Sequence, residues 1–131
     1  MLYTNSDGGA RGNPGPGAIG VLIRRNNKVI KTYSEKVGRA TNNIAEYLAL
    51  IKALELALKY GKEVTCILDS ELIVKQLNGE YRVKNLKLKD LFEKVKNLEK
   101  GFRKISYKHV SRWNKFQIIA DSLLNKELDK E

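Results

Sequence analysis

The first third of the chain alternates between short hydrophobic runs and turn residues, which is typical of antiparallel strands. Residues 1–7 and the hydrophobic run at 18–25 predict two strands, and Asn26 with Asn27 favours a hairpin turn into a third strand at residues 28–37. An Asp-Gly-Gly sequence that begins at Asp7 predicts a turn at the end of the first strand. We therefore expect a three-stranded antiparallel meander.

The hydrophobic period then changes to that of a helix. Over residues 43–60 apolar side chains recur at spacings of four, three, three and four, which predicts an amphipathic helix that Gly61 ends. The expected apolar face consists of Ile44, Leu48, Ile51, Leu54 and Leu58.

The rest of the chain alternates strands with helices. Because later strands separated by helices require right-handed parallel crossovers, the pattern predicts an α/β fold with a five-stranded mixed sheet and helices on both faces. The further predicted elements are a strand at 63–68, a helix from Asp69 and Ser70 to about 78, a helix at 86–99, a strand at 103–110 and a helix at 116–128.

Composition narrows the class of protein. A length of 131 residues with 42% hydrophobic residues suits one globular domain over residues 1–131. No apolar stretch approaches the roughly 18 residues that a membrane span needs, and the first residues do not resemble a secretory signal. The single cysteine, Cys66, excludes an intrachain disulfide and a zinc site built on thiolates. A reducing cytoplasm is the expected compartment.

The charge of +10 indicates a polyanionic partner, because Lys and Arg that neutralise phosphates release counterions. Residues 75–115 contain 13 Lys or Arg against 4 Asp or Glu, a local excess of +9. We expect this segment to face phosphates. The alternative is that its lysines form an ordinary solvated surface.

Four acidic residues in different local settings carry the candidate chemistry: Asp7, Glu46, Asp69 and Asp121. If the fold gathers them, their mutual repulsion favours either bound protons or bound divalent cations. Oxygen ligands without His or Cys favour Mg²⁺ or Mn²⁺ over zinc.

Each acid also has an ordinary structural interpretation. Asp7 could belong to an Asp-Gly turn, Glu46 could complete a capping box with Asn43, and Asp69 could cap its helix. Asp121 could lie on the polar flank of the last helix. Local sequence alone does not choose between these roles and a shared site.

The order of the motifs favours a shared site over separate structural roles. The segment DGGARGNPGPG begins at Asp7, TNNIAE ends at Glu46, LDS contains Asp69 and ADSLL contains Asp121. In this order they resemble the ribonuclease H family, specifically its small type 1 enzymes, over residues 2–128. The resemblance implies a three-layer fold with strand order 3-2-1-4-5, in which the first and fourth strands are parallel neighbours that bring Asp7 and Asp69 together.

The resemblance also implies an activity. A family member hydrolyses the RNA strand of an RNA/DNA hybrid with two metal ions and leaves 5′-phosphate and 3′-hydroxyl ends. It implies that Asp7 and Asp69 are shared by both Mg²⁺ ions, with Glu46 on the leaving-group side and Asp121 on the water side; Mn²⁺ is a substitute. The substrate-binding residues that it implies, besides Thr41 for a DNA phosphate, are Gly8, Gly9, Asn13, Asn42, Asn43, Ser70 and Arg112.

The chain departs from many bacterial relatives in lacking a Lys-rich extra helix and a loop that bears histidine. Duplex binding is therefore expected to use other cations, for example Arg82, Lys84, Lys87 and Lys89. The single histidine, His109, is expected to be structural rather than a mobile proton carrier.

The last motif is also unusual. Two residues are inserted between Arg112 and Asp121, and Gln117 stands where relatives often have Asn. Trp113 could either stack on nucleic acid or pack in the core.

Three alternatives remain open at this stage. The protein could also cut double-stranded RNA, could be another nuclease of the same superfamily such as a resolvase or an exonuclease, or could be a catalytically silent hybrid-binding module. GNPGPG with TNN disfavours a resolvase or an exonuclease, and the presence of all four acids disfavours silence. A monomer is expected.

Overall fold

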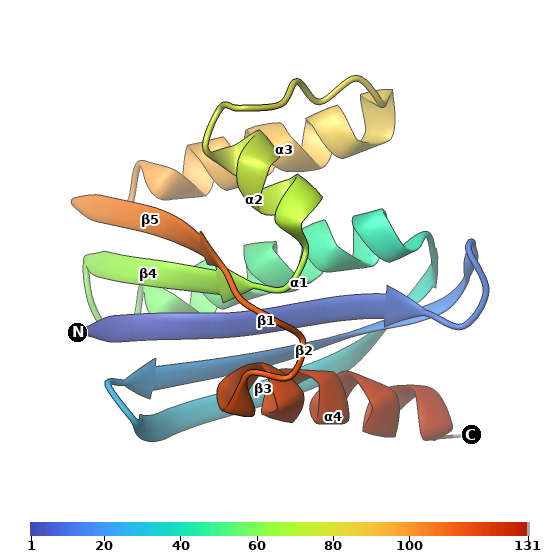
Figure 1. The fold of residues 1–131 in the computed structure, drawn as a ribbon, viewed down its shortest axis with the longest axis horizontal. Coiled ribbons are helices and arrows are strands. Elements are labelled where there is room, and N and C mark those ends of the chain that lie inside the picture. Colours follow the sequence, from blue (N-terminus) through green and yellow to red (C-terminus); the bar gives the residue numbers. More distant parts are fainter. Residues whose placement is uncertain (131) are drawn as a thin grey trace.

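A computed structural model describes residues 1–130, in which strands and helices follow the predicted order (Figure 1). The sheet has the strand order β3-β2-β1-β4-β5. The first three strands are antiparallel, whereas β1 with β4 and β4 with β5 are parallel. The elements are β1 (Leu2–Ala10), β2 (Gly15–Arg25), β3 (Lys28–Ala40), α1 (Asn42–Ala57), β4 (Glu63–Leu68), α2 (Glu71–Leu77), α3 (Leu86–Glu99), β5 (Lys104–His109) and α4 (Lys115–Asp129).

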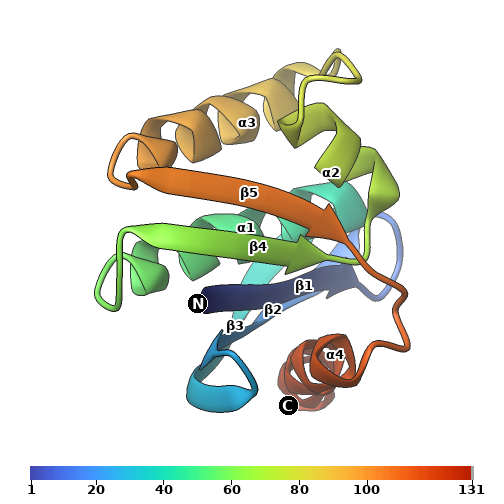
Figure 2. The same cartoon turned by 60° about the vertical axis from the view of Figure 1, so that its left-hand side comes forward.

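Helices cover both faces of the sheet, as predicted (Figure 2). Residues 8 and 9 of β1 show this directly, because successive residues of a strand point to opposite faces: Gly8 abuts α1 at Ala45, and Gly9 abuts α4 at Leu124. On the α1 face, α2 and α3 complete the main hydrophobic core, which includes Ile73 and Val95. No helix within residues 1–130 combines the length and hydropathy of a membrane span.

The predicted turn at Asp7 is wrong. β1 continues to Ala10 because β2 supplies pairing partners along its whole length, including Gly20 opposite Asp7. The pairing of β1 with β4, however, stops at Asn5 opposite Ile67. Asp7 therefore lies just past the last parallel pair, where the side of β1 that β4 occupied becomes open.

The predicted apolar face of α1 is only part of its buried surface. Of its five residues, Leu54 alone is fully buried and the others are half-buried. The helix lies between the sheet and α3, so small residues on its sheet side, at Ala45, Ala49 and Ala53, are completely buried as well. The helix also ends earlier than Gly61, at Ala57 with Leu58 as its C-cap.

Candidate active site

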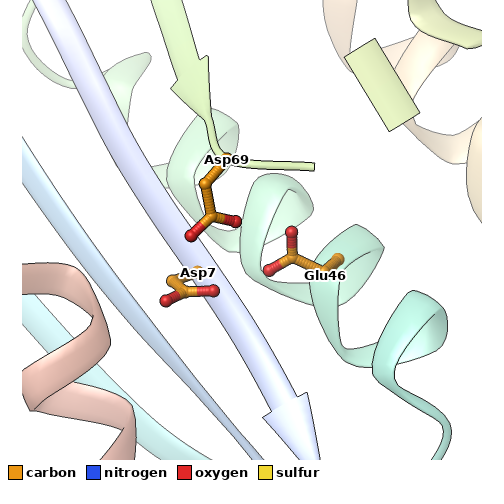
Figure 3. A group of neighbouring side chains, drawn as sticks. All are labelled: Asp7, Glu46 and Asp69. Atoms are coloured by element: carbon orange, nitrogen blue, oxygen red, sulfur yellow. The ribbon is translucent and has the colours of Figure 1, made fainter. Parts of the chain in front are cut away.

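Three of the four predicted acids converge at the end of β4. One carboxylate oxygen from each of Asp7, Glu46 and Asp69 lies within 4.8 Å of the others. The three side chains come from β1, α1 and the residue directly after β4, and they point toward one another (Figure 3). Asp7 and Glu46 are buried, and Asp69 is half-buried.

Close packing of α1 on β1 places Glu46. A Cβ at residue 8 would collide with the backbone carbonyl of Ala45, so Gly8 allows the helix to approach the strand. The Gly8 backbone N–H then donates a hydrogen bond to Glu46 Oε1. Within residues 1–130 the second oxygen, Oε2, is buried without a hydrogen-bond partner. Glu46 thus offers a free acceptor to the cluster.

The helix caps are made by other residues, which leaves two of the acids free for chemistry. Thr41 caps α1 by accepting from the Ile44 N–H at 3.2 Å, so Glu46 takes no part in a capping box with Asn43. Ser70 caps α2 by accepting from the Ile73 N–H at 3.3 Å, so Asp69 is not the cap. These two structural interpretations are therefore wrong.

Asp121 lies near this cluster but is not a member of it. It is exposed on α4 and lines a cavity of about 410 Å³ with Asp7 and Asp69. We call this the carboxylate cavity; its remaining lining residues are Arg112, Trp113 and Ile118. Trp113 is 72% exposed there, so the interpretation of Trp113 as a core residue is wrong.

The acids disturb one another electrostatically. Burial, followed by repulsion from Glu46, raises the pKa of Asp7 far above the ordinary value of an aspartate. Burial also raises the pKa of Glu46, and burial together with the charge of Asp121 raises the pKa of Asp69. The cluster consequently binds protons unless a cation compensates its charge.

A hard divalent cation fits this arrangement. The clustered ligand atoms are all carboxylate oxygens, which suit Mg²⁺ or Mn²⁺, and Glu46 Oε2 is an unused acceptor. His109 is exposed on β5 and does not line the carboxylate cavity. The buried Cys66 is also outside the cluster. Asp7, Glu46 and Asp69, with Asp121 at the cavity, are the residues that would hold the ions.

The predicted substrate-binding residues divide into separate places. Gly8 and Gly9 lie within β1, Ser70 caps α2, and Arg112 lines the carboxylate cavity with its guanidinium 4.9 Å from the centre of the Trp113 ring. The others gather in a second cavity of about 460 Å³ at the start of α1, which we call the amide pocket. The amide pocket is lined by Asn13, Thr41, Asn42, Asn43, Ile44, Asn85, Lys87 and Leu88.

Hydrogen bonds hold the amide pocket in shape. The Asn42 N–H donates to Asn13 Oδ1 at 3.0 Å, and the Ala10 N–H donates to Asn42 Oδ1 at 2.9 Å. Asn85, which sequence reasoning missed, caps α3 through the Leu88 N–H and brings Lys87 to the same pocket. Its signal in the sequence was an Asn directly before a predicted helix.

Comparison with known proteins identifies the family. A family model described as "Reverse transcriptase-like" matches residues 5–124. A ribonuclease H of Neorickettsia sennetsu is 37% identical over 117 residues, which cover 86% of this chain and 76% of that protein. The chain belongs to the ribonuclease H family.

Two further ribonuclease H relatives extend the likeness over nearly the whole chain. The bifunctional protein Rv2228c of Mycobacterium tuberculosis is 39% identical over 98% of this chain, which spans only 35% of that longer protein. A solved structure described as LC11-RNase H1 in complex with RNA/DNA hybrid superposes with a TM-score of 0.92 at 38% identity, covering 98% of this chain and 97% of that one. The ribonuclease H fold is thus shared over nearly the whole chain.

Proposed function

We propose that the protein is an endonuclease that hydrolyses the RNA strand of RNA/DNA hybrids and leaves 5′-phosphate and 3′-hydroxyl ends. The convergence of Asp7, Glu46 and Asp69, with Asp121 at the same cavity, carries the proposal. Support comes from a relative of nearly the same length whose structure is described as a complex with RNA/DNA hybrid. Mg²⁺ is the proposed cofactor, and Mn²⁺ is a substitute.

The positions of the acids support the division of labour that the family resemblance implies. Asp7 and Asp69 belong both to the cluster with Glu46 and to the lining of the carboxylate cavity with Asp121. Glu46 belongs to the cluster but not to the cavity lining, and Asp121 belongs to the cavity lining but not to the cluster. We assign Asp7 and Asp69 to the shared positions, Glu46 to the leaving-group side and Asp121 to the water side.

The residues of the chain bind and orient the reacting groups. When bound, two divalent ions supply an activated water and neutralise charge on the leaving oxygen. Asp7, Asp69 and Glu46, held by β1, the end of β4 and α1, would contribute ionised acceptors that orient the scissile phosphate once cations compensate their charge. Arg112, exposed at the rim, suits contact with a phosphate of the substrate.

The amide pocket provides the neutral donors that distinguish RNA from DNA. Asn43 lies three residues before Glu46, within one turn of α1, so the pocket and the carboxylates face neighbouring parts of one duplex. The amides of Asn13, Asn42 and Asn43 suit minor-groove edges and ribose 2′-hydroxyls. Thr41 with Lys87 suits a phosphate of the DNA strand.

A panel of labelled substrates tests the proposal. Short RNA/DNA hybrid, double-stranded RNA, double-stranded DNA and single-stranded RNA would each be incubated with Mg²⁺, Mn²⁺ or a chelator. We expect cleavage of the hybrid's RNA strand with either metal, none with the chelator, and products that carry a 5′-phosphate. The Asp7→Asn variant controls for contaminating nucleases. Absence of hybrid cleavage with both metals contradicts the proposal, and cleavage of double-stranded RNA broadens it.

A further inference from the structure

A chain of buried polar side chains runs behind the carboxylate cavity, on the α4 face of the sheet. It joins Arg24 of β2, Asn5 of β1 and Gln117 of α4, which are 8%, 0% and 0% exposed. Arg24 Nε donates to Asn5 Oδ1 at 3.0 Å, and Asn5 Nδ2 donates to Gln117 Oε1 at 3.2 Å. Gln117 Nε2 then donates to the Ser6 carbonyl at 2.8 Å.

Arg24 fixes the direction of every hydrogen bond in this chain. A guanidinium only donates, so the Asn5 oxygen must face Arg24 and the Asn5 amide nitrogen must face Gln117. Gln117 must in turn present its oxygen to Asn5 and its NH₂ group to Ser6.

Arg24 is itself held firmly. Its guanidinium carbon lies 4.3 Å from the ring centre of Tyr3 and 4.1 Å from that of Phe116, and Nη1 donates to the Asn26 carbonyl at 2.6 Å. No ion pair joins Arg24 to a carboxylate within residues 1–130. A buried cation without such a partner is costly, and apolar side chains would fill the space at lower cost.

The chain of hydrogen bonds ends beside the proposed metal ligands. Ser6 directly precedes Asp7 on β1, and Gln117 lies four residues before Asp121, one turn along α4. The amide of Gln117 therefore ties the first turn of α4 to β1 next to Asp7. This arrangement links Asp7 and Asp121 through one buried side chain.

We propose that Gln117, oriented by Asn5 and Arg24, is a positioning residue that holds Asp121 in register with Asp7 for metal binding. The proposal rests on the function proposed above, and it concerns a position where relatives often carry the shorter Asn. Partners that orient metal ligands in this way commonly contribute about 10- to 100-fold to metal affinity or activity.

Binding of Mn²⁺ to the substrate-free protein, measured by titration calorimetry, tests this role without relying on activity. We expect Gln117→Leu to weaken Mn²⁺ binding about tenfold and to lower kcat, with little change in KM for the hybrid. Gln117→Asn should restore part of the Mn²⁺ affinity, because its amide keeps both hydrogen-bonding groups.

Gln76→Leu is the matched control. Gln76 is also buried and its Oε1 accepts a hydrogen bond from the Tyr47 hydroxyl at 2.6 Å, but it belongs neither to the cluster of acids nor to the lining of the carboxylate cavity. Its loss should lower the melting temperature without changing Mn²⁺ affinity. If Gln117→Leu and Gln76→Leu both lower the melting temperature and both keep wild-type Mn²⁺ affinity, Gln117 is only structural and the proposal is wrong.

Asn5→Leu tests whether the hydrogen bonds from Arg24 through Asn5 orient Gln117. It also replaces Gln117→Leu if that variant does not fold. We expect weaker Mn²⁺ binding, and a double variant with Gln117→Leu should lose no more than the larger single effect. Unchanged Mn²⁺ affinity in Asn5→Leu contradicts the proposal. A wild-type protein that binds no Mn²⁺ would instead contradict the metal site of the proposed function, so the two failures are distinguishable.

Discussion

The cluster of Asp7, Glu46 and Asp69 and the amide pocket both use residues of α1, but they differ in how well their polar groups are satisfied. In the amide pocket, the oxygens of Asn13, Asn42 and Thr41 each accept a backbone N–H. Beside the carboxylate cavity, acids crowd together, Glu46 Oε2 is buried unpaired, and burial raises the pKa of Asp7. The amide pocket is formed before any ligand arrives, whereas the acids require a cation.

Neutralising one acid of the cluster should have the largest effect on hybrid cleavage. We expect Asp7→Asn or Asp69→Asn to lower hybrid cleavage in Mg²⁺ by at least about 10³-fold, because the metal-holding unit loses a shared ligand. Hybrid binding should survive or improve, and the melting temperature should not fall, since a repulsive charge is removed. Turnover and binding would be measured separately.

The exposed Asp90 on α3 supplies the control for that experiment, because Asp90→Asn removes the same charge away from the cluster. It should leave turnover near that of the wild type. Near-normal turnover of Asp7→Asn or Asp69→Asn in Mg²⁺ is the outcome that rules out the metal-holding unit.

Removing cations near the amide pocket should affect binding rather than chemistry. Lys84, Lys87 and Lys89 are exposed, and Lys87 lines the pocket. Neutralising all three should weaken binding to every duplex and flatten the dependence of log affinity on log salt by up to about one unit for each phosphate that the protein no longer neutralises. Turnover at saturating hybrid should persist. An unchanged salt dependence would show that these lysines are only a solvated surface.

The acids should also give the metal-free protein an unusual dependence of stability on pH. The folded state raises the pKa values of Asp7 and Glu46. The contribution of these two acids to the stability of the fold is therefore fully present below their unfolded-state pKa values, near pH 4, and is lost as the pH rises through their folded-state pKa values. In chelator, we expect the melting temperature of the wild type to fall relative to that of Asp7→Asn as pH rises above about 4.

Adding Mg²⁺ should reverse this loss of stability at higher pH. A cation that compensates the acids removes the penalty of ionising them, so the stabilisation by Mg²⁺ should increase with pH. We expect the melting temperatures with and without Mg²⁺ to differ by a few degrees. Thermal unfolding at several pH values, with and without the metal, would measure this difference. A melting temperature of Asp7→Asn that runs parallel to that of the wild type at every pH would show that folding does not raise the pKa of Asp7.

The sequence predicted most of the fold because its strongest signals are local. The strand at 63–68 and the helix at 86–99 were predicted with the same bounds that the structure has, since periodicity and flanking turn residues agree there. The turn at Asp7 was wrong because Gly8 serves close packing against Ala45, which a local pattern of Asp and Gly does not distinguish from a turn.

Long-range contacts account for what sequence reasoning missed at the site. The grouping of Asp7, Glu46 and Asp69 was anticipated through the order of motifs, and the structure places them together. The hydrogen bond between Asn5 and Gln117 joins residues separated by 112 positions, and no periodicity encodes it. Its only sequence signal was a Gln at a position where relatives often have Asn.

Substitution of His109 has the smallest expected effect. It tests whether proton transfer in the carboxylate cavity proceeds without an imidazole. The residue is exposed on β5 and pairs with Leu68, directly before Asp69, but it does not line the carboxylate cavity. A proton carrier must reach the reacting phosphate, and a residue fixed in a strand has little freedom to do so.

We therefore expect His109→Ala to lower turnover by less than about tenfold, below the roughly 10²- to 10⁴-fold expected for loss of a positioned acid or base. Lys108→Ala, an exposed neighbour on the same strand, controls for loss of a β5 side chain. Turnover, melting temperature and hybrid affinity would be measured together, because a structural histidine should change them in parallel. A hundredfold fall in turnover alone would give His109 a catalytic role and would mean that the carboxylates do not act without it.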